Sequence, residues 1–224
     1  MKAAPETQIM LFQMEKRAEL LGQEAEQLIY VMLPQKAVDL QEILKSNKYF
    51  QQSFIQQLQQ QLNEKLLPKT SDTIDMNPII DFYSEPLPQI YEFEDFVREN
   101  IREILKITEQ IKAWITVCDA SEDQLQYLSD IVTALTQTDD IGNQLIQRIL
   151  SFHSTRQRLF NKLTKRKLFD VAKTLVQHDI GQVTEIQNGF GELYNQLIIG
   201  YDVTIKNFER YRRIPGVKGF EGMY

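Results

Sequence analysis

The side chains that most often carry chemistry in proteins are scarce in this chain of 224 residues. It has one cysteine, Cys118, and two histidines, His153 and His178. Zinc sites need several thiolate, imidazole or carboxylate ligands at short spacings, and these three residues stand far apart in the sequence. They are a poor ligand set for zinc, so the sequence predicts no metal site.

None of these residues sits in a pattern typical of catalysis. His153 lies beside a stripe of apolar residues, where a partly buried, hydrogen-bonded histidine is the common case. Cys118 ends such a stripe and is most simply a small buried hydrophobic residue. The glycine pair Gly189 and Gly191 lies inside a helical pattern and carries little weight as a nucleotide-binding loop. The sequence therefore predicts no catalytic residue, no cofactor and no enzymatic activity.

The charge of the chain argues against two classes of partner. The formal net charge is −6, which argues against nucleic acid or an anionic membrane as the main partner. One basic group is interpreted as a solvated helix end; it consists of Lys162, Lys165, Arg166 and Lys167. The longest wholly apolar stretch, Leu28–Leu33, is too short to cross a bilayer, and the first residues lack the pattern of a signal peptide. We therefore expect a cytoplasmic or nuclear protein.

Apolar periodicity predicts a long, kinked first helix and a further helical stretch behind it. The first stripe alternates steps of three and four and consists of Leu11, Met14, Ala18, Leu21, Ala25, Leu28 and Met32. Pro34 interrupts this stripe and predicts a kink, because the spacing resumes at Ala37 and Leu40. A stripe with a spacing of four residues follows, at Phe50, Phe54, Leu58, Leu62 and Leu66.

The stretch from about residue 68 to 90 is the one long stretch without helical periodicity. It holds several helix-breaking residues, which are Pro68, Pro78, Pro86 and Pro88. The sequence therefore predicts a flexible linker here, inside a single domain that spans residues 1–224.

Three more helices are predicted after this linker. The second helix should end near Cys118, because Ser121–Gln124 has the spacing of a capping box for a new helix. The third keeps its apolar phase from Leu128 to Leu163, which argues against a break at 139–143. The fourth is predicted from Asp170, as its N-cap, to about Arg212.

The fourth helix contains an unusual number of glycines, which are Gly181, Gly189, Gly191 and Gly200. Each costs roughly 1 kcal/mol relative to alanine, so they indicate either close helix–helix contact or a break near Gly181. The predicted fold class is all-α: an up-down-up-down four-helix bundle with long helices. In it, the loop beside Trp114 and the tail of residues 214–224 lie at the same end.

Several of these segments resemble the eleven-S regulator (REG) family of proteasome activators, and the likeness covers nearly the whole chain. Leu33–Lys45 resembles that family's kinked first helix, and Asn100–Trp114 resembles its second helix. The fourth helix ends on a Tyr-Asp-x-x-x-Lys-Asn-Phe-Glu match at Tyr201–Glu209. This match, with the Pro-Gly that follows and the terminal Gly-Met-Tyr, is the most specific part of the resemblance.

The resemblance implies an assembly and a mechanism. Members of the family form heptameric rings of four-helix subunits, so self-association into a homoheptamer is expected. Such rings dock on the 20S proteasome core particle and open its gate without ATP, which stimulates peptide hydrolysis. Their C-terminal residues enter pockets between the core's α-subunits, where the terminal carboxylate meets a lysine. By resemblance, this role falls on Gly222, Met223 and Tyr224.

The resemblance also places an activation loop, which displaces the gate, between the second and third helices. By position it maps onto Asp119, Ala120, Ser121, Glu122, Asp123, Gln124, Leu125, Gln126 and Tyr127. The family usually reads Ile-Glu-Asp-Gly-Asn-Asn-Phe-Gly here. This chain keeps the acidic pair and an aromatic residue but lacks both glycines and both asparagines, so its loop cannot adopt the same backbone freely.

A rival hypothesis comes from another class of protein. A helical scaffold or adaptor with no proteasome role would share the four-helix pattern. A monomer or dimer that does not bind the core particle would favour this rival.

Overall fold

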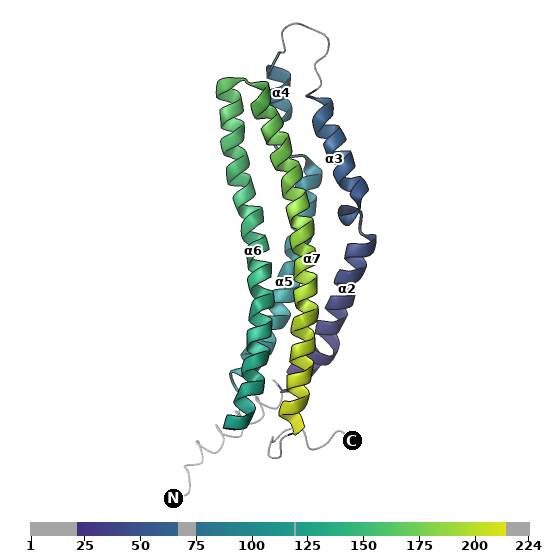
Figure 1. Cartoon of the computed structure of the whole chain (residues 1–224), viewed down its shortest axis with the longest axis vertical. Coiled ribbons are helices and arrows are strands. Elements are labelled where there is room, and N and C mark those ends of the chain that lie inside the picture. The colour runs from purple at the N-terminus through teal and green to yellow at the C-terminus, as the bar shows by residue number, and fades with distance from the viewer. Residues whose placement is uncertain (1–21, 67–74, 119, 214–224) are drawn as a thin grey trace, which may run out of the picture. The chain divides into compact units, whose positions relative to one another are not determined.

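The computed structural model describes residues 22–66, 75–118 and 120–213, which form helices and short connections with no strand. The first helical region comprises residues 22–27, a π-helical turn η1 (Leu28–Met32), α2 (Leu33–Ser46), a 3₁₀ turn η2 (Lys48–Phe50) and α3 (Gln52–Glu64). The short helix α4 (Asn77–Phe82) precedes three long helices, α5 (Pro88–Ile115), α6 (Glu122–Arg166) and α7 (Phe169–Arg213) (Figure 1). The predicted all-α class is confirmed.

The chain divides into two compact units. Unit 1 takes the described residues of Met1–Asp39, Arg102–Asp140 and Tyr194–Tyr224, and unit 2 takes those of Leu40–Ile101 and Ile141–Leu193. Each unit therefore contains part of the first helical region and one segment each of α5, α6 and α7 (Figure 1). Each segment buries an apolar face in its own unit. The four apolar faces together form the core of a helical bundle. The buried residues include Ile29, Leu33, Ile104, Ile111, Leu135 and Leu197 in unit 1, and Leu58, Phe93, Val97, Leu145, Ile149 and Phe190 in unit 2.

Pro34 changes the first helical region without ending it. Proline lacks a backbone N–H, and its ring crowds the carbonyl of the residue four places earlier, here Tyr30. The turn before it, η1, is a π-helix in which the Leu33 N–H donates to the Leu28 carbonyl. This wider turn accommodates the missing donor. The interruption predicted at Pro34 thus takes the form of a π-helical turn.

A second interruption, at Asn47, has no counterpart in the predicted pattern. The Asn47 backbone is extended, with φ −71° and ψ 134°, and its side chain accepts a hydrogen bond from the Tyr49 N–H at 3.0 Å. The Tyr49 ring is buried in unit 2, with its centroid 5.1 Å from that of Phe54 and 5.3 Å from that of Phe93. The side-chain cap and this aromatic packing together divide the helical region into α2 and α3.

The predicted linker over about residues 68–90 is wrong at residues 77–82 and 88–90, which are helical. Helix α4 lies within it, and α5 begins at Pro88. The prolines do not prevent these helices, because Pro78 and Pro88 lie in first turns, where no backbone N–H is needed. The Tyr83 hydroxyl donates to the Leu62 carbonyl and is buried in an apolar cluster of unit 2. Residues 68–74 of the predicted linker lie outside the described residues.

The predictions for the two longest helices are confirmed, except for one start. The Ser121 N–H donates to the Gln124 side-chain oxygen at 2.8 Å, as the capping box predicts. Helix α6 runs through residues 139–143 without a break, and α7 runs through Gly181. Asp170 is not the N-cap of α7. The helix begins at Phe169, and the Leu168 carbonyl accepts the first helical hydrogen bonds.

The glycines of α7 fall into two groups. A Cβ atom at Gly200 would lie 2.9 Å from Thr138 Oγ1 of α6, in unit 1, and one at Gly189 would lie 2.9 Å from Leu145 Cδ1, in unit 2. At Gly181 and Gly191 a Cβ atom would meet nothing within 4 Å. Close helix contact therefore explains Gly189 and Gly200 and does not explain the other two.

We expect opposite effects from Gly181→Ala and Gly200→Ala. The first should raise the free energy of unfolding by about 1 kcal/mol, because alanine favours the helix and its Cβ meets nothing. The second should lower it, because Thr138 is fully buried and would have to move away from the new Cβ. Urea unfolding followed by circular dichroism measures both. Equal midpoints for the two variants would contradict this account of the α6–α7 contact.

Candidate functional site

The end of unit 1 where α5 ends and α6 begins holds the predicted activation loop. Helix α5 ends at Ile115 and α6 begins at Glu122, so the connection between them is residues 116–121. Of the predicted loop residues, Ala120 and Ser121 precede α6, while the six that follow form its first turns. Asp119 lies outside the described residues. The predicted loop is thus too long at its C-terminal side, because the capping box starts the helix at Glu122.

The surface of this connection combines charge and apolar area. Glu122 and Asp123 are exposed in the first turn of α6, where carboxylates interact favourably with the positive end of the helix dipole. Val117, within the connection, and Leu125, in the first turn of α6, are 53% and 54% exposed. Large apolar side chains with this exposure can contact a partner without any change in the core. We call residues 116–118 and 120–125 the connection surface.

Trp114 lies under this connection and is buried. Its ring meets two aromatic rings of α7 edge-on, with centroid distances of 5.4 Å to Phe208 and 6.1 Å to Tyr211. Its carbonyl accepts a hydrogen bond from the Val117 N–H at 3.0 Å. Trp114 therefore both fills the core of unit 1 and braces the start of the connection.

Cys118 is partly buried within this connection. Burial raises the pKa of its thiol to about 11, although a hydrogen bond with the Tyr211 side chain acts in the opposite direction. The sulfur lies 3.5 Å from the Trp114 carbonyl oxygen, to which the thiol donates. A thiol with a raised pKa is a poor nucleophile at neutral pH, so the geometry favours a packing role.

The last turns of α7 are held to the first helical region within unit 1. The Tyr30 hydroxyl donates to the Glu209 carboxylate, and its ring packs on Phe208 at 5.7 Å. Arg212 lies 3.2 Å from the Glu26 carboxylate and 3.4 Å from the Tyr30 hydroxyl. These contacts anchor the end of α7 immediately before the tail. The predicted binding residues Gly222, Met223 and Tyr224 lie outside the described residues.

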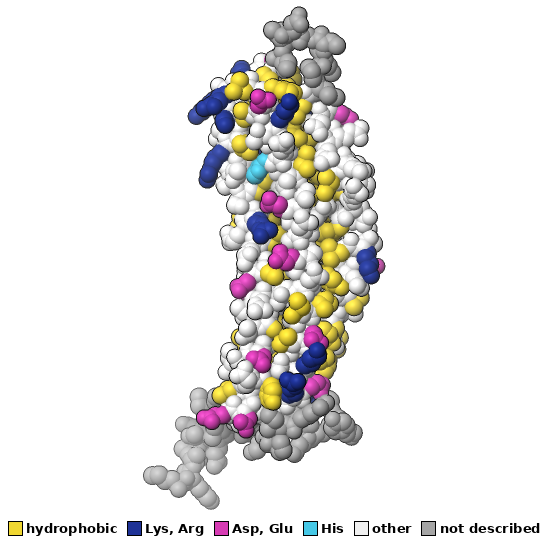
Figure 2. Space-filling view, viewed as in Figure 1, with side chains coloured by type: hydrophobic (Ala, Val, Ile, Leu, Met, Phe, Trp, Pro, Cys, Tyr) yellow, Lys and Arg dark blue, Asp and Glu magenta, His cyan; other side chains and the backbone are white. Residues whose placement is uncertain are grey.

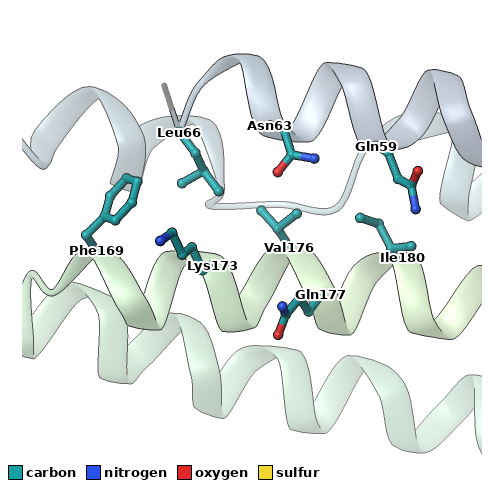
Figure 3. A pocket seen from close by; sticks show the side chains of 8 residues that line it. All are labelled: Gln59, Asn63, Leu66, Phe169, Lys173, Val176, Gln177 and Ile180. Carbon is teal, nitrogen blue, oxygen red and sulfur yellow. The ribbon is translucent and has the colours of Figure 1, made fainter. Parts of the chain in front are cut away.

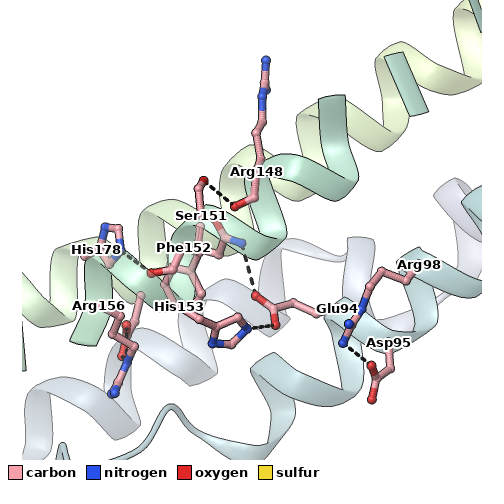
Figure 4. A network of polar contacts seen from close by, with 11 residues as sticks. Glu94, Asp95, Arg98, Arg148, Ser151, Phe152, His153, Arg156 and His178 are labelled. Atoms are coloured by element: carbon pink, nitrogen blue, oxygen red, sulfur yellow. Dashed lines mark hydrogen bonds and ion pairs between the residues drawn. The ribbon is translucent and has the colours of Figure 1, made fainter. Parts of the chain in front are cut away.

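Unit 2 holds a buried polar network that the sequence pattern only partly indicates. The Glu94 side chain is fully buried; it lies 2.7 Å from His153 Nε2 and accepts from Gln182 Nε2 at 3.2 Å (Figure 4). Arg156 Nε donates to both oxygens of Asp179, at 2.9 and 3.1 Å. His153 is partly buried and hydrogen-bonded, as predicted.

The other members of this network are residues that sequence reasoning missed. Three charged residues lie on the buried, apolar faces of their helices, about one turn from buried apolar side chains. They are Glu94, Arg156 and Asp179. A charged residue on an otherwise apolar helix face is a sequence signal that could have identified them, because a buried charge needs a partner. Their partners come from other helices, so the pairing itself is not readable from one helix.

This network lacks the parts of a hydrolytic site among the described residues. The nearby hydroxyls of Ser151 and Ser154 donate to carbonyls of their own helix, at 3.0 and 2.9 Å, and not to His153. Within the same described ranges, no group of three or more metal-binding side chains converges. What the network does show is pairing of buried and partly buried polar groups, Glu94 with His153 and Gln182, and Arg156 with Asp179.

We expect the burial of Glu94 to make stability depend on pH. Burial raises the pKa of its carboxyl above the ordinary value of 4.5, although His153 and Gln182 act in the opposite direction. The folded protein then holds the proton more tightly than the unfolded chain does. The contribution of Glu94 to stability is therefore full below pH 4.5 and is lost as the pH rises through the raised pKa.

Glu94→Gln tests this dependence, because glutamine has a similar size and does not titrate. The free energy of unfolding of the native protein, relative to that of this variant, should fall as the pH rises from 4.5 through the raised pKa of Glu94. Urea unfolding at a series of pH values measures this difference. Glu99→Gln, an exposed site on the same helix, is the control and should show no such change. A difference in the free energy of unfolding that stays constant or rises with pH would refute the raised pKa of Glu94.

One groove in unit 2 is large enough for a small ligand. It has a volume of about 550 Å³ and lies between α3 and the first turns of α7 (Figure 3). It is lined by Gln59, Asn63, Leu66, Phe169, Lys173, Val176, Gln177 and Ile180. Lys173 Nζ lies 4.8 Å from the centre of the Phe169 ring. The lining holds one cation and no acid, so it offers no acid–base pair for catalysis.

The basic group at the end of α6 lies at the surface. Basic side chains gather over this end of the helix (Figure 2, upper left), and Lys162, Lys165, Arg166 and Lys167 are exposed. This agrees with a solvated helix end. No described helix is both long and apolar enough to cross a membrane.

Comparisons with known proteins cover both the first helical region and the three long helices. A family model described as "Proteasome activator PA28, N-terminal" matches residues 13–64, and one described as "Proteasome activator PA28, C-terminal" matches residues 85–214. "Proteasome activator 28" of Dictyostelium discoideum is 24% identical over 186 residues, which cover 80% of each protein. The crystal structure of the 11S subunit of the Plasmodium falciparum proteasome, PA28, superposes with a TM-score of 0.68. It is 17% identical, and the match covers 95% of this chain and 97% of that one, so it shows a shared fold.

Proposed function

The chain belongs to the proteasome activator PA28 family, and on this premise we propose that it activates the 20S proteasome core particle without ATP. In this proposal a ring of identical subunits, seven by resemblance, docks on the α-subunits of the core particle and opens its gate. Its role is regulatory, and the core particle carries out the peptide hydrolysis. A place in the cytoplasm or nucleus is part of the same proposal.

The observation that carries this proposal is the extent of the family match. The two family models together span residues 13–64 and 85–214, which include the described parts of α2, α3, α5, α6 and α7. A helical scaffold with a merely similar pattern would share the fold class without matching both halves of this family. Family membership therefore supports association with the proteasome and assembly into a ring.

We assign two roles to two parts of the chain. Gly222, Met223 and Tyr224 anchor the ring, with the terminal carboxylate paired to a lysine in a pocket between core subunits. The connection surface acts on the gate. Its support is chemical: Glu122 and Asp123 are exposed and charged, and Val117 and Leu125 add apolar area beside them.

Several tails on one ring explain how weak contacts can hold the complex. A tail of a few residues binds weakly by itself, because ordering it on binding costs conformational entropy. Once one tail of a ring is bound, the others act at a high effective concentration. Linked sites of this kind gain roughly 10²–10⁴ in avidity without any new contact.

Turnover of a fluorogenic peptide by purified core particle, without nucleotide, tests the function. We expect several-fold stimulation by the full chain, whose native mass should be that of a ring. Substituting Glu122 and Asp123 together by alanine should leave core-particle binding unchanged and lower the maximal stimulation. A monomer or dimer without stimulation would favour the scaffold hypothesis, and full stimulation by the double variant would place the gate-opening residues elsewhere.

A further inference from the structure

We propose that Trp114 and Tyr211 are positioning residues for gate opening, and that they hold the connection between α5 and α6 against the last turns of α7. This inference rests on the proposed function, in which the residues after α7 anchor the ring and the connection surface acts on the gate. All the contacts that carry it lie within unit 1.

The first contact is between aromatic rings. The Trp114 ring meets Tyr211 edge-on, at a centroid distance of 6.1 Å and an interplanar angle of 86°. It meets Phe208 at 5.4 Å and 73°. Trp114 is 5% exposed and Tyr211 is 3% exposed, so neighbouring atoms restrain both rings. Edge-to-face packing favours a particular relative orientation, and the end of α5 therefore has a defined position on α7.

The second contact passes through the backbone of Trp114. Its carbonyl oxygen accepts from the Val117 N–H at 3.0 Å and from the Cys118 thiol at 3.5 Å. The same residue whose ring packs on α7 thus also holds the first residues of the connection. A displacement of Trp114 would move Val117 and Cys118 with it.

The third contact closes this set. Cys118 is near enough to α7 for the Tyr211 side chain to act on its thiol, lowering the thiol pKa against the effect of burial. Trp114 thus contacts both Tyr211 of α7 and Cys118 of the connection. The ring contact with α7 and the two bonds to the Trp114 carbonyl together fix the position of the connection better than any one of them does alone.

The place of Tyr211 gives this arrangement a functional consequence. It lies in the last turn of α7, which ends at Arg213, and the proposed anchor follows in the sequence. If a docked tail restrains the end of α7, that restraint would be transmitted to the connection surface through Tyr211, Trp114 and Cys118. Contiguous packed side chains of rigid elements can carry such coupling. The anchor and the gate-opening surface would then keep a fixed position relative to each other.

Three variants test this proposal in the peptide-turnover assay, each titrated against the core particle. Trp114→Leu removes the aromatic contact. Tyr211→Phe removes the hydroxyl that acts on the Cys118 thiol, and Cys118→Ala removes the thiol that donates to the Trp114 carbonyl. We expect Trp114→Leu to lower the maximal stimulation about fivefold, the lower end of typical coupling between sites. The two smaller changes should lower it less. The activator concentration for half-maximal stimulation should not change, because the anchor is intact.

Two control variants separate positioning from simple loss of packing. Trp114→Phe keeps an aromatic edge against α7 and should recover most of the stimulation that Trp114→Leu loses. Tyr83→Phe removes the hydroxyl of an equally buried tyrosine, which donates to the Leu62 carbonyl in unit 2, and should leave maximal stimulation unchanged.

The outcomes distinguish this proposal from the proposed function. If the unaltered chain does not stimulate hydrolysis, the proposed function fails, and this inference fails with it. If the unaltered chain stimulates and Tyr211→Phe and Cys118→Ala reach the same maximum, only the positioning role is refuted. These two variants decide the matter even if Trp114→Leu does not assemble, because each removes only a single oxygen or sulfur atom from the core.

Discussion

Deleting Met223 and Tyr224 is expected to abolish stimulation of the core particle and to leave the ring intact. In the proposed anchor, the deletion would remove the side chains that fill the pocket and would move the terminal carboxylate away from the pocket lysine. If the tails act together on one ring, as proposed, every subunit would lose its contact at once, and the avidity of roughly 10²–10⁴ would be lost with it. Fluorogenic peptide turnover measures stimulation, and native mass spectrometry measures the ring.

Two further tail variants show which part of the anchor matters. Adding one glycine after Tyr224 keeps all side chains but displaces the carboxylate, and it should lower stimulation nearly as much as the deletion does. Tyr224→Phe keeps the aromatic side chain and the terminal carboxylate, and this variant should retain most of the stimulation. Unchanged stimulation after the deletion would show that the anchor lies outside these residues.

Arg156→Met is expected to cause the largest loss of stability among the substitutions considered. Arg156 is 3% exposed and Asp179 is 0% exposed, so the substitution leaves a carboxylate buried without its partner. Arg156 also donates to the Glu85 carbonyl at 2.9 Å, just before α5, so a third element loses its contact. Breaking a buried pair in this way costs about 3–5 kcal/mol. Urea unfolding followed by circular dichroism measures the loss.

Two controls test whether the unpaired charge causes this loss. Combining Arg156→Met with Asp179→Leu removes both charges and should recover most of the stability, because a buried pair can often be replaced by apolar residues. Lys206→Met breaks an exposed pair with Asp202, whose side chains are 64% and 55% exposed, and should cost less than about 1 kcal/mol. A loss for Arg156→Met no greater than that for Lys206→Met would contradict a structural role for the pair.

The misread linker shows why prolines are ambiguous in a sequence. Pro78 and Pro88 look like helix breakers, yet each lies in the first turn of a helix, where a proline is favourable. What decides between the two cases is whether the residues that follow bury an apolar face. Ile79 and Tyr83 do so against Leu62 and Leu175, which stand in other helices. That contact cannot be read from the segment alone.

The interruption at Asn47 has a similar origin. The apolar spacing continues on both sides of it, and spacing was the signal that predicted the helix. The helix ends because the Asn47 side chain caps the next turn and Tyr49 packs among aromatic rings of unit 2. Local hydrogen bonds and packing outweigh a periodic pattern over so few residues.

The sequence by itself determined the all-α class, the family, the continuity of α6 and α7, and the scarcity of groups that could do chemistry. These features depend on composition, on motifs and on apolar periods within single helices, which are local properties of the chain. The tertiary structure alone decided which residues of different helices meet, such as Trp114 with Tyr211 and Arg156 with Asp179. Those pairings depend on how each helix is rotated and shifted against its neighbours, and packing sets that only when the helices come together.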